Sequence, residues 1–118
     1  MCYLYMEDPV ANALKKGSLD MLVLALLEDG PKHGYEIGKQ IEERSGRTLK
    51  FNVASLYPAL YALERKGLVA GSWGTASNGR RRRCYRLTRP GRKALEEQRA
   101  RWREFSEAID TIAKVSYA

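Results

Sequence analysis

The sequence has few of the residues that form disulfide frameworks and metal centres. Its 118 residues include two cysteines, Cys2 and Cys84, and a single histidine, His33. Two cysteines so far apart along the chain fit free thiols in a reducing cytoplasm better than a disulfide. A histidine without a second histidine or a cysteine nearby lacks the partners of a metal site, so capping or packing is the favoured role of His33. No metal or cofactor is expected.

Long hydrophobic runs are also missing. The longest apolar run, residues 21–27, has seven residues, whereas a helix that spans a bilayer needs about 20. The first residues lack the charged start, apolar middle and small-residue cleavage site of a secretory signal. We therefore expect a cytoplasmic protein without a membrane helix. With 44% apolar and 30% charged residues, the composition is typical of one folded domain of this length.

Three helices are predicted in the first half of the chain. Ser18 is placed to cap a helix from 19 to about 28, which is apolar on nearly every side. A second helix is expected over 34–44. Asn52 is the expected N-cap of a third helix over 53–66. The side chains predicted to face the core are Tyr35, Ile37 and Ile41 on the second helix and Val53, Leu56, Leu60 and Leu63 on the third.

A hairpin and a long helix are predicted next. Two strands over 68–73 and 82–87 are joined by a loop with an Asn78-Gly79 step, which favours positive φ. Thr88 caps a last helix that continues to about Val115. This order is the layout of a winged helix-turn-helix. The predicted fold is therefore mainly α with a small β-hairpin: residues 1–16 form an N-terminal extension or short helix, 17–88 a winged helix-turn-helix DNA-binding domain and 89–118 a C-terminal dimerisation helix.

Positive charge is concentrated in one stretch of the chain. The formal net charge is +7, yet residues 80–103 alone contain eleven Lys or Arg and two Glu. Four consecutive arginines stand beside a turn, where like charges repel one another unless an anion accompanies them. Guanidinium groups bind phosphate oxygens in a bidentate fork, so nucleic-acid contact is favoured over a merely solvated surface. The four residues are Arg80, Arg81, Arg82 and Arg83.

The third helix supplies further candidates for DNA contact. Short polar side chains near a helix N-terminus can approach base edges, while Tyr hydroxyls and Arg reach phosphates. The candidates are Asn52, Ser55, Tyr57, Tyr61 and Arg65. Two alternatives stay open: Tyr57 suits the core as well as it suits a phosphate, and Asn52 is first a helix cap and only second a DNA contact.

The last helix carries an apolar seam. Leu95, Gln98, Trp102, Phe105, Ile109 and Ile112 recur at spacings of three and four, as in a helix that packs along another helix. A helix of about 25 residues is longer than so small a domain can cover, so we predict a homodimer. Two-fold symmetry then predicts a pseudo-palindromic DNA site. The expected interface residues are Leu19, Leu22, Leu26, Leu95, Trp102, Phe105, Ile109 and Ile112.

Five sequence blocks, in this order, resemble the PadR family of transcriptional regulators. They are Lys16-Gly-Ser-Leu-Asp20, His33-Gly34-Tyr35, Ser55-Leu-Tyr57-Pro58-Ala-Leu60, Leu63-Glu-Arg-Lys-Gly67-Leu68 and Tyr85-Arg-Leu87-Thr88-Arg-Pro-Gly91-Arg92. The resemblance covers about residue 16 to at least residue 105. It implies a winged-helix DNA-binding domain and a C-terminal helical part that pairs two subunits. With one such helix, the chain is similar to the short subfamily.

The resemblance also concerns an effector. In short PadR regulators, a Trp at this point of the last helix is paired across the dimer and lines a pore where flat aromatic compounds stack. Trp102 resembles it, and Phe105 could add a second ring face; ordinary seam packing is the favoured alternative. We expect a sequence-specific, ligand-responsive transcriptional repressor that binds double-stranded DNA as a homodimer. The alternative is a small-molecule-binding or scaffolding dimer with an incidental basic wing. No paired carboxylates, metal cluster or activated nucleophile point to an enzyme.

Overall fold

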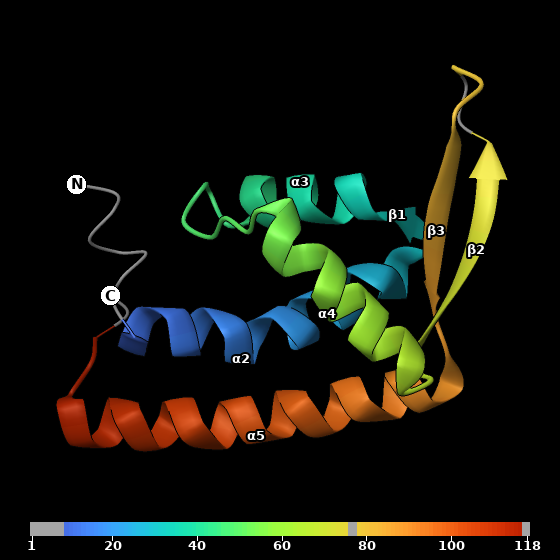
Figure 1. Cartoon of the computed structure of the whole chain (residues 1–118). Helices are drawn as coiled ribbons and strands as arrows, with labels where there is room; N and C mark the ends of the chain where they lie inside the picture. Colours follow the sequence, from blue (N-terminus) through green and yellow to red (C-terminus); the bar gives the residue numbers. More distant parts are fainter. Residues whose placement is uncertain (1–8, 76–77, 117–118) are drawn as a thin grey trace.

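A computed structural model describes residues 9–75 and 78–116 of the chain. The expectations for residues 1–8, including Cys2, lie outside the described residues. The fold is mainly helical with one small antiparallel sheet, as predicted. The elements in chain order are α2 (Pro9–Leu26), the 3-10 turn η1 (Leu27–Asp29), β1 (Lys32–His33), α3 (Gly34–Arg44), α4 (Val53–Arg65), β2 (Val69–Thr75), β3 (Arg81–Leu87) and α5 (Arg89–Ala113) (Figure 1).

The first helix differs from its prediction. Ser18 does not cap it, because α2 begins at Pro9 and continues without a break through Gly17 and Ser18 to Leu26. Proline suits a first helical position, where its missing N–H has no helical partner. A glycine inside a helix costs only about 1 kcal/mol relative to alanine. Packing along α5 offsets that cost, and the two helices lie side by side in Figure 1.

The sheet has three strands rather than the predicted two. β3 lies in the centre and pairs antiparallel with both β1 and β2. The β2–β3 hairpin is confirmed, and its strands reach further toward the turn than predicted, with Thr75 opposite Arg81. In β1, Lys32 pairs with Tyr85 and His33 with Cys84. Two residues are too few to show the alternating pattern that identifies a strand.

The core lies where the helices meet the inner ends of the hairpin strands. Two residues that the helical pattern placed inside are exposed instead: Tyr35 is 67% exposed and Val53 is 66% exposed. Both lie in the first turn of a helix. The hydrophobic spacing includes these first-turn residues, although no other element in the described part of the chain packs over them. The buried hydrophobic residues are Leu19, Val23, Leu24, Leu26, Leu27, Ile37, Ile41, Leu56, Leu60, Leu63, Val69, Tyr85, Leu87 and Leu95.

The long helix α5 is fixed to the body near its start. The Thr88 hydroxyl caps it by accepting from the Gly91 backbone N–H at 3.1 Å, as predicted. Further along, Arg99 donates to both carboxylate oxygens of Glu28 at 2.6 and 3.1 Å. The rest of α5 runs on beside α2 (Figure 1). None of the helices in the described part of the chain combines the length and the apolar character that crossing a membrane requires.

Candidate nucleic-acid interface

The N-terminus of α4 is held by the side chain that the sequence predicted. The Asn52 Oδ1 atom accepts from the Ser55 backbone N–H at 3.0 Å, which confirms Asn52 as the N-cap. Ser55 and Arg65 are exposed, and Tyr61 is 47% exposed. These side chains therefore form one accessible face that extends from the first turn of α4 to its last.

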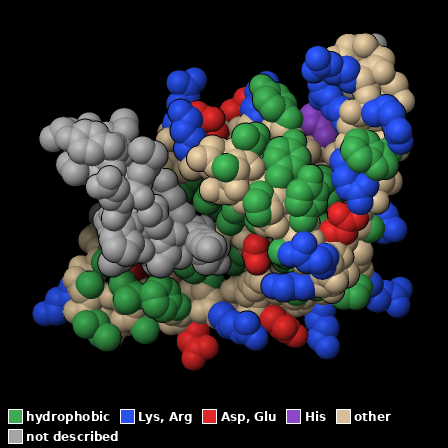
Figure 2. Space-filling model, in the orientation of Figure 1, with side chains coloured by type: hydrophobic (Ala, Val, Ile, Leu, Met, Phe, Trp, Pro, Cys, Tyr) green, Lys and Arg blue, Asp and Glu red, His purple; other side chains and the backbone are tan. Residues whose placement is uncertain are grey.

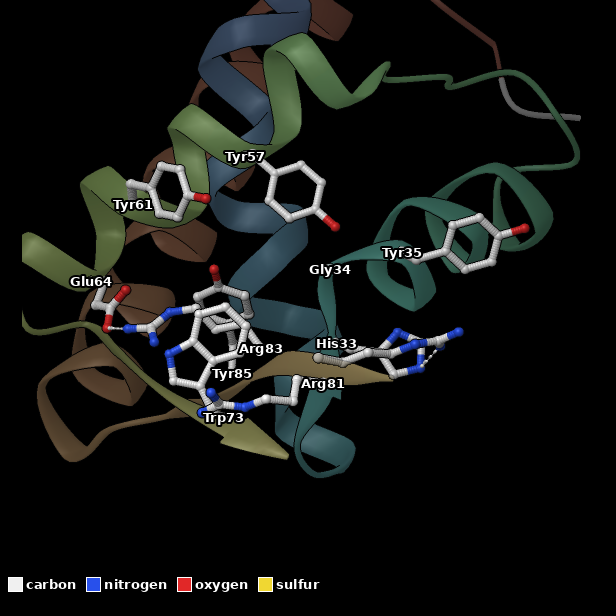
Figure 3. A pocket seen from close by; sticks show the side chains of 11 residues that line it. His33, Gly34, Tyr35, Tyr57, Tyr61, Glu64, Trp73, Arg81, Arg83 and Tyr85 are labelled. Atoms are coloured by element: carbon white, nitrogen blue, oxygen red, sulfur yellow. Dashed lines mark hydrogen bonds and ion pairs between the residues drawn. The ribbon is translucent and has the colours of Figure 1, made fainter. Parts of the chain in front are cut away.

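Tyr57 takes an intermediate position between the core and the surface. Its side chain is half-buried, and the ring fills the space that a Cβ on Gly34 would occupy, 2.8 Å from that position. The Tyr57 and Tyr61 rings lie 6.4 Å apart at an angle of 44°. Figure 3 shows the Tyr57 hydroxyl directed away from α4, toward the start of α3. Tyr57 therefore packs on the start of α3 and is only partly exposed.

The first two arginines of the wing point outward. The wing is the β2–β3 hairpin, and its turn includes Gly79 with φ +83°, which suits the predicted Asn-Gly step. Asn78 Oδ1 accepts from the Arg80 backbone N–H at 3.0 Å. Arg80 and Arg81 are exposed, and the Arg81 guanidinium lies 5.2 Å from the centre of the Trp73 ring. Figure 2 shows Lys and Arg side chains gathered on this wing.

Arg82 contacts His33 at the start of α3. His33 Nδ1 accepts from the Glu36 backbone N–H at 3.2 Å, which confirms the predicted capping role of His33. Arg82 Nη1 lies 3.2 Å from His33 Nε2. A guanidinium carries five N–H donors, so this contact leaves other donors of Arg82 available for an anion.

Arg83 is engaged within the protein. It forms an ion pair with Glu64 of α4, and this hydrogen bond holds the pKa of Arg83 above its already high value. The guanidinium also lies 5.5 Å from the centre of the Trp73 ring and 5.9 Å from that of Tyr85. Of the four predicted wing arginines, Arg83 is therefore the one turned toward the helix.

A cleft of about 580 Å³ separates α4 and the start of α3 from the wing. It is lined by four tyrosines, Trp73, three arginines, His33, Gly34 and Glu64 (Figure 3). The Tyr85 side chain is fully buried, and its hydroxyl has no hydrogen-bond partner among the described residues. Burial raises the pKa of Tyr85, so the phenol stays protonated. Flat rings and guanidinium groups in one cleft suit sugar-phosphate or base surfaces.

The predicted dimer residues fall into two groups. Leu19, Leu26 and Leu95 are buried in the core of the single chain, and Leu22 is half-buried, so these side chains are used within the subunit. The second group is exposed: Trp102 by 46%, Phe105 by 51%, Ile109 by 45% and Ile112 by 81%. Figure 2 shows hydrophobic side chains gathered over the C-terminal part of α5. The centres of the Trp102 and Phe105 rings are 5.9 Å apart.

Sequence reasoning gave no role in this site to six of the residues that line the cleft, namely His33, Gly34, Tyr35, Glu64, Trp73 and Tyr85. Glu64 and Tyr85 stood out only as parts of family blocks, and Trp73 only as the end of a predicted strand. A signal for one of them existed, because Trp73 and Arg83 are opposite each other in the hairpin register. Side chains directly opposite in an antiparallel pair interact. The involvement of Glu64 had no such signal, since it lies on a different element.

Comparison with known proteins identifies the chain. Residues 23–97 match the model of the transcriptional regulator PadR-like family. An uncharacterised protein from Lysinibacillus sphaericus is 33% identical over 86% of this chain and 93% of its own length. A transcriptional regulator from Mycobacterium tuberculosis is 28% identical over 80% of this chain and 85% of its own length.

Solved structures agree with this match. A PadR family transcriptional regulator from Eggerthella lenta is similar over 98% of this chain and 99% of its own, with a TM-score of 0.79 and 28% identity. A PadR family transcription regulator from Clostridium difficile is 31% identical and is similar over 81% of this chain and 98% of its own, with a TM-score of 0.72. These likenesses confirm the winged-helix fold. The chain belongs to the PadR-like family of transcriptional regulators.

Proposed function

We propose that this regulator binds duplex DNA sequence-specifically, as a cytoplasmic homodimer. The observation that carries the proposal is the position of the guanidinium groups on the wing. Arg80 and Arg81 are exposed, Arg82 is half-buried beside His33, and the polar face of α4 lies across the cleft from them. In winged-helix proteins the recognition helix enters the major groove, and a neighbouring basic element can bind the adjacent backbone.

Each contact has a chemical role in this arrangement. Ser55 near the N-terminus of α4 is short enough to let the helix approach base edges, where it can donate or accept. Asn52 is exposed at the start of α4, where its side chain is first the helix cap and only second a DNA contact. Tyr61 and Arg65 reach phosphates on the flank of the groove, and Tyr57 offers its hydroxyl beside them. Arg80, Arg81 and Arg82 hold the phosphates on the wing side.

The exposed face of α5 supports a homodimer. Four large hydrophobic side chains at spacings of three and four are exposed by 45–81%. This pattern is typical of a helix that packs against a helix of another subunit. The proposed dimer interface consists of Trp102, Phe105, Ile109 and Ile112. The symmetric pair would place two α4 helices about one DNA turn apart on a pseudo-palindromic operator.

A repressor controlled by a flat aromatic effector is the finer form of this proposal. Trp102 and Phe105 present two exposed rings, and their partners across the dimer would double that surface. An effector bound there would change the spacing of the two α4 helices only if it bound one arrangement better than the other. A planar dye should quench Trp102, and Trp102→Ala should either loosen the dimer or abolish the quenching. A variant unchanged in both properties would remove Trp102 from both roles.

The experiment that tests DNA binding starts with selection of binding sites from random duplexes. Mobility shift at several salt concentrations then gives the dissociation constant and its salt dependence. We expect a selected site to bind at least about a thousandfold more tightly than random duplex. Arg81→Ala with Arg82→Ala should weaken all duplexes alike and reduce the salt slope by about 1 for each phosphate that is no longer neutralised.

The matched control removes the same charge elsewhere. Arg101→Ala with Arg103→Ala lowers the net charge equally but lies on α5, outside the proposed DNA-contact surface. It should change affinity much less than the wing variant. Weak binding that is indifferent to sequence, with equal effects of both variants, would favour the scaffolding or small-molecule alternative over a DNA-reading regulator.

A further inference from the structure

Glu64 occupies an unusual position for a DNA-binding protein. It lies on α4 and lines the cleft between that helix and the wing. A carboxylate near a polyanion is unfavourable unless a cation neutralises it. Arg83, nineteen positions further along the chain, supplies that cation through an ion pair in which both side chains are 27–28% exposed. The acid therefore connects the recognition helix to the wing.

The backbone of the wing leaves room for this connection. A Cβ on Gly71 would lie 2.8 Å from the Arg83 Nε atom and 2.9 Å from its Cζ atom. Any larger residue at position 71 would push the guanidinium out of its place over β2. The absent side chain thus allows Arg83 to extend across the neighbouring strand to α4.

Trp73 adds a second contact that holds Arg83 in this position. The Arg83 guanidinium lies 5.5 Å from the centre of the Trp73 ring, within the range of a cation–π interaction. Arg81 lies 5.2 Å from the same ring. Figure 3 shows these side chains grouped at the end of the cleft next to Glu64. One cluster therefore joins α4, the Trp73 ring and the outward-pointing arginine of the wing.

We propose that Glu64 is a specificity-determining residue, because its ion pair with Arg83 fixes the angle between the wing and α4. The inference rests on the proposed DNA-binding function. Arg83 is in this case a positioning residue and not a phosphate contact. A wing free to swing would reach phosphates on any duplex, which adds affinity without discrimination. A wing held by Glu64 meets phosphates only when α4 is correctly seated in the groove.

The test measures the ratio of the dissociation constants for random duplex and for the tightest selected duplex. Glu64→Gln keeps the shape of the side chain and removes its charge. We expect this ratio to fall about tenfold, with random-duplex binding unchanged or tighter. Glu96→Gln removes an equal charge from exposed Glu96 on α5 and should leave the ratio within twofold. Equal ratios in wild type and Glu64→Gln would overturn the proposal.

A charge-swapped variant separates positioning from phosphate contact. Glu64→Arg combined with Arg83→Glu keeps the net charge and can re-form the pair in the opposite direction. If Arg83 positions the wing, the swap should recover the ratio beyond that of Arg83→Gln alone. If Arg83 contacts phosphate, the swap should bind DNA more weakly than Arg83→Gln, because it places a carboxylate on the wing beside the backbone. The second outcome contradicts the proposal.

A measurement without DNA keeps the two proposals distinguishable. In a Trp102→Phe background Trp73 is the remaining tryptophan, since the chain has two. Its quenching by acrylamide should rise about twofold on Glu64→Gln, because the released Arg83 no longer covers the ring. Unchanged quenching would show that Glu64 does not hold Arg83 in place and would overturn the proposal. If quenching rises but wild type does not discriminate between duplexes, the DNA-binding function fails and the Glu64–Arg83 connection survives.

Discussion

Asp20 is a half-buried acid on α2. Burial raises the pKa of its carboxyl above the usual 3.8, and the positive charge of Lys66 partly opposes this shift. The folded state therefore favours the protonated form of Asp20. Such a group stabilises the fold at low pH, and that contribution is lost as the pH rises through the raised pKa. At neutral pH the charged carboxylate is a small cost to the folded state.

Asp20→Asn should remove this cost. Because the site is half-exposed and screened by solvent, we expect a gain in the free energy of unfolding of no more than about 0.5 kcal/mol at pH 7. The gain should disappear near pH 3, where both side chains are neutral. Urea unfolding at the two pH values measures it. A substitution that destabilises the protein at pH 7 would mean that the carboxylate makes a favourable contact outweighing its burial.

Single residues were predictable where their chemistry is local. Asn52, His33 and Thr88 each precede a helix, and the hydrogen bond that each cap makes joins atoms three residues apart. Arg83 was assigned to DNA contact because its neighbours in sequence are arginines. In the structure Arg83 pairs with Glu64, which lies on another element, and only the packing of the wing against α4 brings the two together.

At the scale of elements, the strongly patterned segments were predicted well. The bounds of α3, α4 and α5 lie within one or two residues of those expected. The prediction was wrong for α2, where Ser18 and Gly17 looked like a boundary, and it missed β1. Capping residues also occur inside helices, and a two-residue strand forms only because β3 presents a free edge to it. Both outcomes depend on tertiary packing rather than on local preference.

The start of α5 provides a test at this scale. A Cβ on Gly91 would lie 2.0 Å from the Leu68 backbone oxygen and 2.8 Å from a methyl carbon of Leu87. Gly91→Ala must therefore displace α5 from the hairpin, and we expect a loss of about 1–3 kcal/mol in the free energy of unfolding. Urea unfolding of the variant measures that loss.

A second glycine serves as the control for this substitution. A Cβ on Gly38 would lie 3.2 Å from a methyl group at the end of the Leu56 side chain, which can move. The gain of about 1 kcal/mol from replacing a helical glycine with alanine should offset that contact. Equal destabilisation by Gly38→Ala and Gly91→Ala would show that the close contact between Gly91 and Leu68 is not the cause of the lost stability.

At the scale of the whole molecule, the seam on α5 has two parts with different uses. Leu95 is fully buried by the chain itself, whereas Trp102, Ile109 and Ile112 are exposed. The sequence predicted the seam because its spacing is regular. It could not show where the subunit's own packing stops, since a heptad pattern is the same for an internal and an external partner helix.

If the exposed part of the seam is the dimer interface, a single charged side chain introduced there should dissociate the dimer. Ile109→Glu would place a carboxylate within the proposed interface, and we expect at least a tenfold weaker dimer, since an unpaired charge is costly to bury. Sedimentation velocity over a range of concentrations measures this change. Thr111→Glu adds the same charge at an exposed site on the other side of α5 and should leave the dimer intact. Identical sedimentation of wild type and Ile109→Glu would remove this face as the interface.

Hydroxyl-radical footprinting on the tightest selected duplex reports both which bases are read and whether the complex is symmetric. We predict two protected half-sites related by a two-fold axis, with centres about 10 base pairs apart. The wing variant Arg81→Ala with Arg82→Ala should lose the protection that flanks each half-site. A single asymmetric footprint, or uniform weak protection along the duplex, would contradict a symmetric pair of DNA-reading subunits.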